Sequence, residues 1–147
     1  MELIFIDAAH PLYPQELELR YQVLRAPLGF DRSQVKFPFD AQSLHLVAVE
    51  DGRVVGCVLF HPEAPHTGRL FQMAVDPTRQ KGGLGARLVR ALEERLRGQG
   101  LEEITLHARA HVVGFYEKLG YAVYGEPFEE RGIPHRYMRR RLEEGVR

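Results

Sequence analysis

Short stretches rich in apolar and β-branched residues alternate along this chain with segments whose apolar residues recur at helical spacing. Four such stretches predict strands in the first half of the chain, at 3–6, 44–50, 53–61 and 69–75. Between the first two, Leu17, Tyr21 and Leu24 recur at helical spacing within 14–25, which predicts a helix. Asp51-Gly52 separates the second and third strands, and an Asp-Gly pair in that position is typical of a tight hairpin.

The most regular pattern of the chain follows a group of glycines. Leucines recur every fourth residue from Leu84 to Leu96, which predicts an amphipathic helix that ends near Gly98 and Gly100. Charged residues are expected on the other faces of this helix: Arg87, Arg90, Glu93, Glu94 and Arg97. Two i,i+4 spacings predict salt bridges on that surface, Arg90/Glu94 and Glu93/Arg97.

The remaining elements complete a mixed order of strands and helices. They are a strand at 103–108, a helix at 111–119, a strand at 121–124, a loop at 125–134 and a last strand at 135–142. The order β-α-β-β-β-α-β-α-β-β predicts an α+β fold, in which helices cover a central mixed, mostly antiparallel sheet in α/β/α layers. The unit 70–106 is expected to be a right-handed parallel crossover. No repeat or linker divides the chain, so residues 1–147 are expected to form a single domain.

Composition and charge exclude several classes of protein. The 147 residues carry 20 Lys plus Arg against 20 Asp plus Glu, so no net charge favours nucleic acid or an acidic membrane. Arg139-Arg140-Arg141 is interpreted as the solvated end of the last strand. The single cysteine, Cys57, lies in an apolar run and is expected to be a buried small side chain. No apolar run approaches the ~20 residues of a membrane span, and the first residues lack a basic start, so a cytoplasmic protein is expected.

The glycine-rich segment 80–85 carries the strongest indication of chemistry. It lies between a predicted strand and a predicted helix that has no capping side chain, and glycines there let the backbone approach a phosphate. A P-loop would need Lys-Ser or Lys-Thr after Gly85, and a Rossmann fingerprint would need a glycine where Leu88 stands. Both motifs fail. A phosphate site of another kind and a simple tight turn remain as alternatives. No His or Cys spacing indicates a metal site.

A family resemblance favours the phosphate site. Gln80, Gly83 and Gly85 fit the pattern Gln/Arg-x-x-Gly-x-Gly/Ala, which resembles the acetyl-CoA pyrophosphate loop of the GNAT N-acetyltransferases. Val75-Asp76-Pro77 before the loop and the later run Phe115-Tyr116-Glu117-Lys118-Leu119-Gly120-Tyr121 are similar to two further parts of that family's pattern. The segments 129–135 and 19–29 resemble one uncharacterised bacterial branch with a Glu-x-Gly-Ile-Pro-His motif.

The resemblance implies an N-acetyltransferase that moves the acetyl group of acetyl-CoA directly to a primary amine of a small molecule or peptide, with no covalent intermediate and no metal. The backbone of Met73, Ala74 and Val75 would bind the pantetheine arm in a gap beside the strand 103–108. Tyr116 would be the general acid, and Phe115 and Lys118 would line the cofactor. The residues that would hold the pyrophosphate are Gln80, Lys81, Gly82, Gly83, Leu84, Gly85 and Ala86. Relatives commonly have an asparagine near the start of the following helix; this chain has none, and His111 is the substitute expected.

Several questions stay open at the level of sequence. Five residues are candidates for the base that deprotonates the amine: His107, His111, His135, Glu126 and Glu130. The acceptor would be selected by the irregular segments 27–39 and 125–134. A CoA-binding sensor without catalysis and a structural domain that binds no CoA are the alternative functions. Neither nucleic acid nor a membrane is expected as a partner; many relatives dimerise, so a homodimer stays open.

Overall fold

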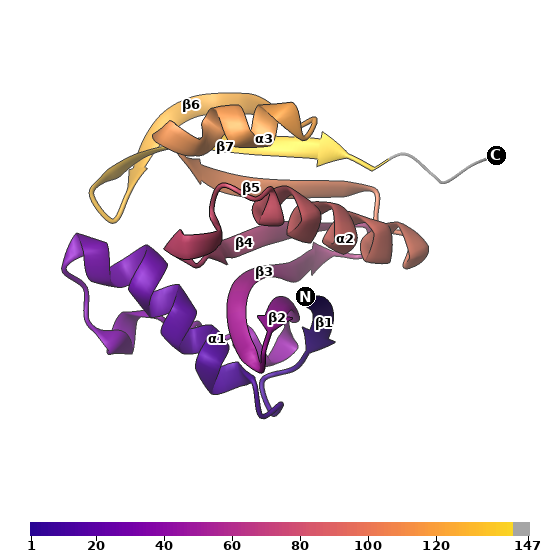
Figure 1. Cartoon of the computed structure of the whole chain (residues 1–147). Helices are drawn as coiled ribbons and strands as arrows, with labels where there is room; N and C mark the ends of the chain where they lie inside the picture. Colours follow the sequence, from indigo (N-terminus) through magenta and orange to yellow (C-terminus); the bar gives the residue numbers. More distant parts are fainter. Residues whose placement is uncertain (143–147) are drawn as a thin grey trace.

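The computed structural model describes residues 1–142, which form one seven-stranded sheet of order β1-β2-β3-β4-β5-β7-β6 (Figure 1). The strands are β1 (Glu2–Ile6), β2 (Leu44–Glu50), β3 (Arg53–Ala64), β4 (Thr67–Val75), β5 (Glu103–Arg109), β6 (Ala122–Glu130) and β7 (Ile133–Arg141). The helices are α1 (Tyr13–Arg20), α2 (Leu84–Gly98) and α3 (Val113–Lys118). Only β4 and β5 pair in parallel within this described part. The predicted order and the mixed, mostly antiparallel sheet of an α+β fold are confirmed.

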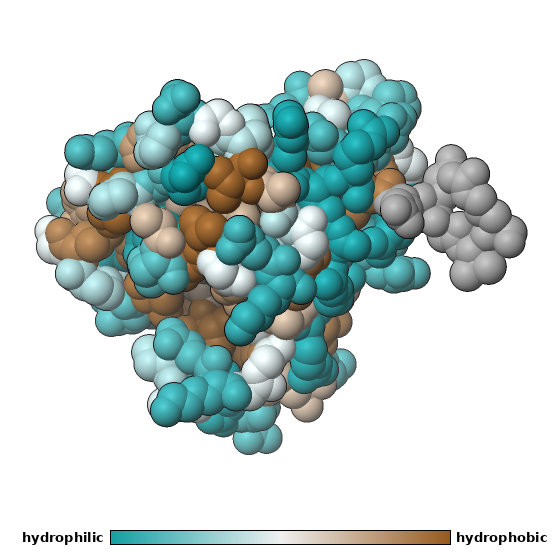
Figure 2. Space-filling view, turned by 90° about the horizontal axis from the view of Figure 1, so that it is seen from above, coloured by the Kyte–Doolittle hydropathy of each residue, from teal (hydrophilic) through white to brown (hydrophobic). Residues whose placement is uncertain are grey.

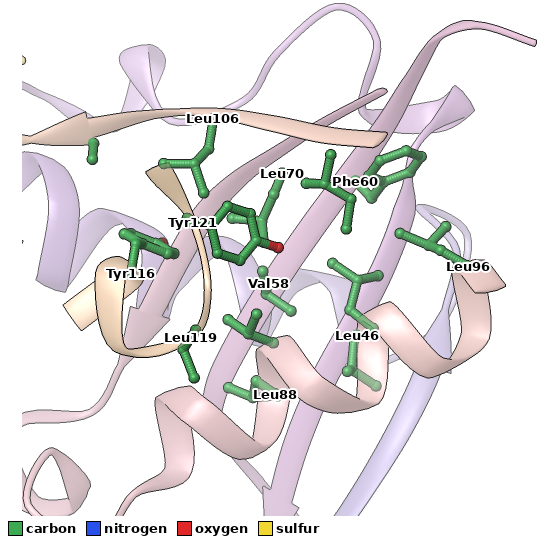
Figure 3. Packing of buried hydrophobic residues seen from close by; sticks show 14 of the residues in the cluster. Leu46, Val58, Phe60, Leu70, Leu88, Leu96, Leu106, Tyr116, Leu119 and Tyr121 are labelled. Atoms are coloured by element: carbon green, nitrogen blue, oxygen red, sulfur yellow. The ribbon is translucent and has the colours of Figure 1, made fainter. Parts of the chain in front are cut away.

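The sheet separates two hydrophobic cores, because side chains along each strand alternate between its faces. On β3, Val58 and Phe60 join the core beneath α2 and α3, whereas Cys57 and Leu59 join the core beneath α1. Figure 3 shows the first of these cores between α2, α3 and the strands. Cys57 is fully buried, as expected, and burial raises the pKa of its thiol.

Helix α2 packs by the leucine repeat that predicted it. Leu84, Leu88, Leu92 and Leu96 are all buried, at most 3% exposed. Gly56 on β3 makes room for the helix, because a Cβ there would lie only 3.0 Å from Cδ1 of Leu88. Apolar contact along one face therefore fixes α2 on the sheet, and with it the position of the glycines that precede the helix.

The charged surface of α2 was predicted incorrectly at Glu93, which is completely buried. Its carboxylate accepts hydrogen bonds from Arg90 (2.8 Å), Arg140 (2.9 Å) and the hydroxyl of Tyr121 (2.9 Å). The ion pairs of this surface are Arg90–Glu93 and Glu94–Arg97 at i,i+3, in place of the expected i,i+4 pairs. Arg140 of β7 and Tyr121, which directly precedes β6, thus supply the partners that a buried carboxylate needs. Arg140 is therefore half-buried and paired, unlike the fully solvated end predicted for this strand.

The segment 125–134 was predicted as a loop, but most of it forms the β6–β7 hairpin. Arg131 and Gly132 have φ values of 54° and 76°, as the two central residues of a tight hairpin turn require. Pro127 obscured the strand in the sequence; it is tolerated because β6 is the edge of the sheet and the pairing is irregular between Tyr124 and Phe128. The hairpin turns on the left of Figure 1.

The surface seen from above β6 is divided in character. Figure 2 shows apolar residues exposed among hydrophilic ones on its left half, the side of the hairpin turn, and mainly hydrophilic residues on its right half. Exposed Arg139 and Arg141 at the end of β7 agree with the hydrophilic side. None of the helices within residues 1–142 has the length and apolar character that crossing a membrane needs.

The connection between α1 and β2 packs on the sheet through its aromatic side chains. Helix α1 runs directly into a π-helical turn (Tyr21–Arg25), and three short 3-10 turns follow before β2. Phe37 and Phe39 stack on each other with ring centroids 5.2 Å apart, and both contact the ring of Phe71 on β4. This contact brings the connection against the strand that faces the cavity described next.

Candidate functional site

The centre of the sheet is split. Strands β4 and β5 pair only at Thr67↔Glu103, Gly68↔Ile104 and Arg69↔Thr105. Beyond these three pairs the strands no longer hydrogen-bond, and a cavity of about 810 Å³ is lined by residues 70–75 on one side and 106–109 on the other. The gap expected between these two strands is present.

A bulge in β4 lies at the cavity wall. Phe71 pairs with Leu59 and Ala74 with Cys57, so β4 has one residue more than β3 between these points. Gln72 has a φ of 52°, in the left-handed region. A bulge of this kind bends a strand and increases its twist. The bulge thus accompanies the turning of β4 away from β5.

The glycine-rich turn lies at one end of this gap. Gly83 caps α2 with a φ of 76°, and no side chain in the described part of the chain caps the helix. The first hydrogen bond of α2 runs from the N–H of Arg87 to the carbonyl of Gly83, so the preceding N–H groups of the first turn are donors without a helical acceptor. Gly85 lies against Met73 and Phe115, since a Cβ there would be 3.1 Å from Cε of Met73. An anion can therefore reach bare backbone N–H groups at the positive end of the helix dipole.

The structure brings most of the predicted cofactor residues to this cavity. Those that line it are Met73, Ala74, Val75, Gln80, Gly83, Gly85, Ala86, His111, Phe115 and Tyr116. Lys81, Gly82, Leu84 and Lys118 do not line it: Leu84 is buried in the core below α2, and the other three are exposed. Gln80 acts on the protein itself, because its Nε2 donates to the carbonyl of Val75 at 3.0 Å and holds the end of β4.

Tyr116 faces the cavity from α3 and is otherwise enclosed. It is 6% exposed, and its ring has edge contacts with Phe115 and Tyr121. Figure 3 shows Tyr116 and Tyr121 in the core between α3 and the sheet. Burial raises the pKa of its phenol well above the ordinary value. The hydroxyl is therefore protonated at neutral pH and can donate a proton to a base that forms in the cavity.

Three of the five candidate bases meet in one cluster. His107 on β5 is 2.8 Å (Nδ1) from Oε1 of Glu130, and Nε2 of His135 is 3.9 Å from the other oxygen of that carboxylate. The hydrogen bond from His107 lowers the pKa of Glu130 to about 2, against the opposing effect of partial burial. His111 lines the same cavity from the turn before α3, and Glu126 is exposed outside the cavity.

Sequence reasoning missed a group of basic residues in the same cavity. Its wall includes Arg25, Arg69, Arg109 and Arg131, which come from four separate segments. Glu130 is the one acidic residue on this wall among residues 1–142. No local pattern could have grouped these arginines, because only the fold places them together. The same described residues contain no group of three or more His, Cys, Asp and Glu side chains placed to hold a metal ion.

Comparison with known proteins now decides the family. The model of the acetyltransferase (GNAT) domain family matches residues 29–142. This chain belongs to the GNAT family. The uncharacterized N-acetyltransferase YitI of Bacillus subtilis (strain 168) is 30% identical over 122 residues, which cover 79% of this chain and 82% of YitI. Matches to two other Bacillus subtilis proteins, a putative acetyltransferase and the uncharacterized protein YyaT, are shorter: the chain spans about half the length of each, 48% and 55%.

Solved structures show that the fold is the GNAT fold. A structure from Lactobacillus plantarum superimposes with a TM-score of 0.87 at 24% identity, over 97% of this chain and 98% of that one. An aminoglycoside 6'-N-acetyltransferase complexed with coenzyme A superimposes with a TM-score of 0.81 at 20% identity over the full length of both chains. At these identities the likeness concerns the fold alone, and the use of the cavity in this GNAT chain has to be argued from its own residues.

Proposed function

We propose that this chain is an N-acetyltransferase of the cytoplasm that transfers the acetyl group of acetyl-CoA to a primary amine by direct attack. The observation that carries the proposal is the continuity of two features: the gap between β4 and β5 leads to the uncapped N-terminus of α2. A ligand with an extended amide-containing arm and a pyrophosphate has the shape and the chemistry for both.

The residues for the cofactor follow from that continuity. The backbone of Met73, Ala74 and Val75 would pair with the pantetheine arm as an added strand, because β4 lacks a partner there on its β5 side. The pyrophosphate would accept from the N–H groups of the first turn of α2, near Gly83 and Gly85. Lys81 and Gly82 would contribute from the rim, outside the cavity itself. Lys118 is exposed outside the cavity and is not among the residues proposed to hold the cofactor.

Tyr116 is the proposed general acid. The amine nitrogen attacks the thioester carbonyl, the C–S bond of the resulting tetrahedral species breaks, and the departing thiolate takes the phenolic proton of Tyr116. Burial keeps that proton on the phenol until a thiolate forms beside it. The amide product then loses the extra proton of the attacking nitrogen to a base, which leaves the total charge unchanged.

His107 is the proposed base among the open candidates. Its Nδ1 is held by Glu130, so in the neutral ring Nδ1 carries the hydrogen and Nε2 keeps its lone pair. Glu130 itself has a pKa of about 2, which makes it a poor proton acceptor and a good partner for an imidazolium. The ring of His107 is fixed further by edge contacts with Phe128 and Tyr137.

The second candidate function is that of a sensor that binds CoA but does not catalyse acetyl transfer. The chain has His111 near the place where the family resemblance leads one to expect an asparagine, and His111 is exposed at the cavity wall. A GNAT chain that binds CoA as a sensor without transferring an acetyl group would also have an intact glycine-rich turn. Thiol release with an amine separates the two functions.

Calorimetry with acetyl-CoA tests the proposal. Wild type should bind, and Gly83→Glu should lose binding because it puts a carboxylate at the pyrophosphate. Gly83→Gln is the matched control: it has the same bulk and the same strain at a φ of 76°, without the charge, and should retain more affinity. Absence of binding by a folded wild-type protein would overturn the cofactor assignment. Binding without thiol release across a broad set of primary amines would favour the sensor.

A further inference from the structure

Two arginines of the cavity wall converge on one backbone oxygen. Nη1 of Arg25 and Nη2 of Arg109 both donate to the carbonyl of Leu24, at 3.2 and 2.9 Å. Arg25 follows α1 and is almost fully buried, whereas Arg109 ends β5, so the fold brings together two guanidinium groups that are far apart in sequence. Leu24 O is a neutral acceptor and cannot offset two positive charges.

Arg131 adds a third positive charge from the turn of the β6–β7 hairpin. Burial, and next to it the nearby charges of Arg131 and Arg109, lower the pKa of Arg25 to about 10. The charge of Arg131 also contributes to lowering the pKa of Arg109. The charge of Glu130 acts on both Arg25 and Arg109, but this carboxylate is already bonded to His107. No ion pair within residues 1–142 engages these three arginines. Arg25 donates to the carbonyls of Leu24 and Gln34, Arg109 donates to that of Leu24, and Arg131 lies over the ring of Phe30, so no carboxylate of the described chain pairs with them.

A fourth arginine strengthens the same conclusion. Arg69 lines the cavity from β4, and its Nε is buried without a hydrogen-bond partner in the described chain. Buried donors in native proteins are normally satisfied. A cavity with four arginines and one engaged carboxylate is therefore built to receive an anion.

The cluster lies away from the turn where the pyrophosphate would bind. The cavity wall beside Arg25 includes Val23, Leu24 and Phe37, and these side chains pack against the core beneath α1. Helix α2 and its glycine turn cover the opposite face of the sheet. Arg131 is next in sequence to Glu130, the partner of the proposed base. The anion site is thus on the acceptor side, beside the place where the amine would lose its proton.

We propose that the acceptor amine carries an anionic group, a carboxylate or a phosphate, which Arg25, Arg109 and Arg131 bind. This inference rests on the proposed acetyl transfer and adds the chemical class of the acceptor. The planar guanidinium fork matches both anions with paired hydrogen bonds. The ammonium group of the acceptor would lie near Glu130 and His107. The anionic group of the same molecule would lie near the arginines, so the acceptor would contact both a negative and a positive part of the cavity wall.

Matched pairs of amines test the proposal, with release of the CoA thiol as the readout. The pairs are 5-aminovalerate with 5-aminovaleramide for a carboxylate, and O-phosphoethanolamine with ethanolamine for a phosphate. The charged member of at least one pair should have kcat/KM about tenfold higher or more. Arg131→Gln and Arg109→Gln should reduce that ratio and raise KM for the amine, with KM for acetyl-CoA within about twofold of wild type.

Control variants separate charge at the site from general effects. Arg131 is exposed, so Arg131→Gln tests the cluster with little risk to folding, and Arg131→Glu should shift preference toward the uncharged amines. Arg53→Gln removes the same charge at an exposed position outside the cavity and should leave all constants unchanged. If the variants raised KM for acetyl-CoA and not for the amine, the cluster would bind a cofactor phosphate, and the proposal would be overturned.

A binding measurement decides the case in which no amine of the panel reacts. The CoA-loaded protein should bind 5-aminovalerate or succinate by calorimetry, and Arg131→Gln should weaken that binding about tenfold. Loaded protein that binds neither probe would overturn the anion site while leaving the cofactor assignment standing. Equal kcat/KM for both members of each pair would do the same. Failure to bind acetyl-CoA at all would instead remove the function on which the inference rests.

Discussion

Nε of Arg20 donates a hydrogen bond to Oε1 of Gln72 at 3.2 Å, which joins a completely buried arginine of α1 to the bulge of β4. The other nitrogens of Arg20 reach Glu16, Asp40 and the carbonyl of Val35. His45 adds a bond to Glu16 at 2.9 Å. The bulge at the cavity wall is thus supported from the α1 side by charges that have no contact with solvent.

Replacing Arg20 should be severe. Arg20→Met removes the cation and leaves the carboxylates of Glu16 and Asp40 buried without it, which typically costs about 3–5 kcal/mol of unfolding free energy. Urea unfolding measures the loss. Arg32→Met is the control: Arg32 pairs with Glu18 on the surface and should unfold at nearly the wild-type urea concentration. Similar midpoints for the two variants would show that the buried network contributes little.

Tyr116→Phe should separate catalysis from binding. It removes the proposed acid and keeps the ring contacts with Phe115 and Tyr121, so kcat should fall about 100-fold while the acetyl-CoA Kd stays within about twofold. Steady-state thiol release and calorimetry provide the two numbers. Tyr124→Phe removes a hydroxyl from β6 outside the cavity and should have wild-type kcat. An unchanged kcat in Tyr116→Phe would assign the acid to another group.

The stability that Glu130 contributes should depend on pH. The hydrogen bond from His107 lowers the pKa of Glu130 from 4.5 to about 2 in the folded protein. A lowered pKa means that the folded state favours the carboxylate, so this contribution is complete above about pH 4.5 and is lost as pH falls toward 2. The difference in unfolding free energy between wild type and Glu130→Gln should therefore decrease as the pH is lowered from about 4.5 toward 2.

Urea titrations at several pH values between 2 and 6 would measure that difference. Glu126→Gln changes an exposed carboxylate of the same strand and should show the pH dependence of wild type. A constant difference between wild type and Glu130→Gln across the range would contradict the role of the His107 hydrogen bond.

Gly68→Ala should destabilise the short ladder between β4 and β5. A Cβ at Gly68 would lie 2.1 Å from Cζ of Phe60 and 2.7 Å from the backbone oxygen of His61. Because the backbone at His61 can move only at a cost in strain, we expect Gly68→Ala to lower the unfolding free energy by about 3 kcal/mol. Gly98→Ala lies at the end of α2, where the added Cβ would meet no other part of residues 1–142 within 4 Å, so it should be neutral or stabilising. Equal stability of the two variants would argue against this close packing.

Local sequence patterns predicted the elements that are determined by interactions between residues close together in the chain. The leucine repeat predicted α2 because one apolar face decides its packing, and the glycines before it predicted an uncapped turn because no side chain could cap it. Burial of Glu93 was missed because the groups that donate hydrogen bonds to it come from later in the chain: Tyr121 just before β6 and Arg140 in β7. Pro127 hid the strand that continues past it, since an edge position cannot be recognised from sequence alone.

The backbone parts of the candidate site were predictable from local spacing, and the family resemblance added side chains, of which His111, Phe115 and Tyr116 line the cavity. The turn at 80–85 and the strand end at 73–75 follow from glycine and apolar spacing, and the structure places both at one cavity. His107, Glu130 and the arginines reach the cavity from separate strands and turns. Their meeting depends on which strands are neighbours, and this order is a property of the whole sheet.

The short ladder between β4 and β5 has a consequence for how the protein avoids association. Exposed strand edges present unpaired N–H and C=O groups and invite another chain to pair with them. Here two such edges face each other in the middle of the sheet and form opposite walls of one cavity. A foreign strand would have to enter with side chains on both of its faces, which the cores on either side of the sheet obstruct. A slender arm such as that of the proposed cofactor would meet less of this obstruction, so a cavity walled by two strand edges would exclude a foreign strand and still admit the arm.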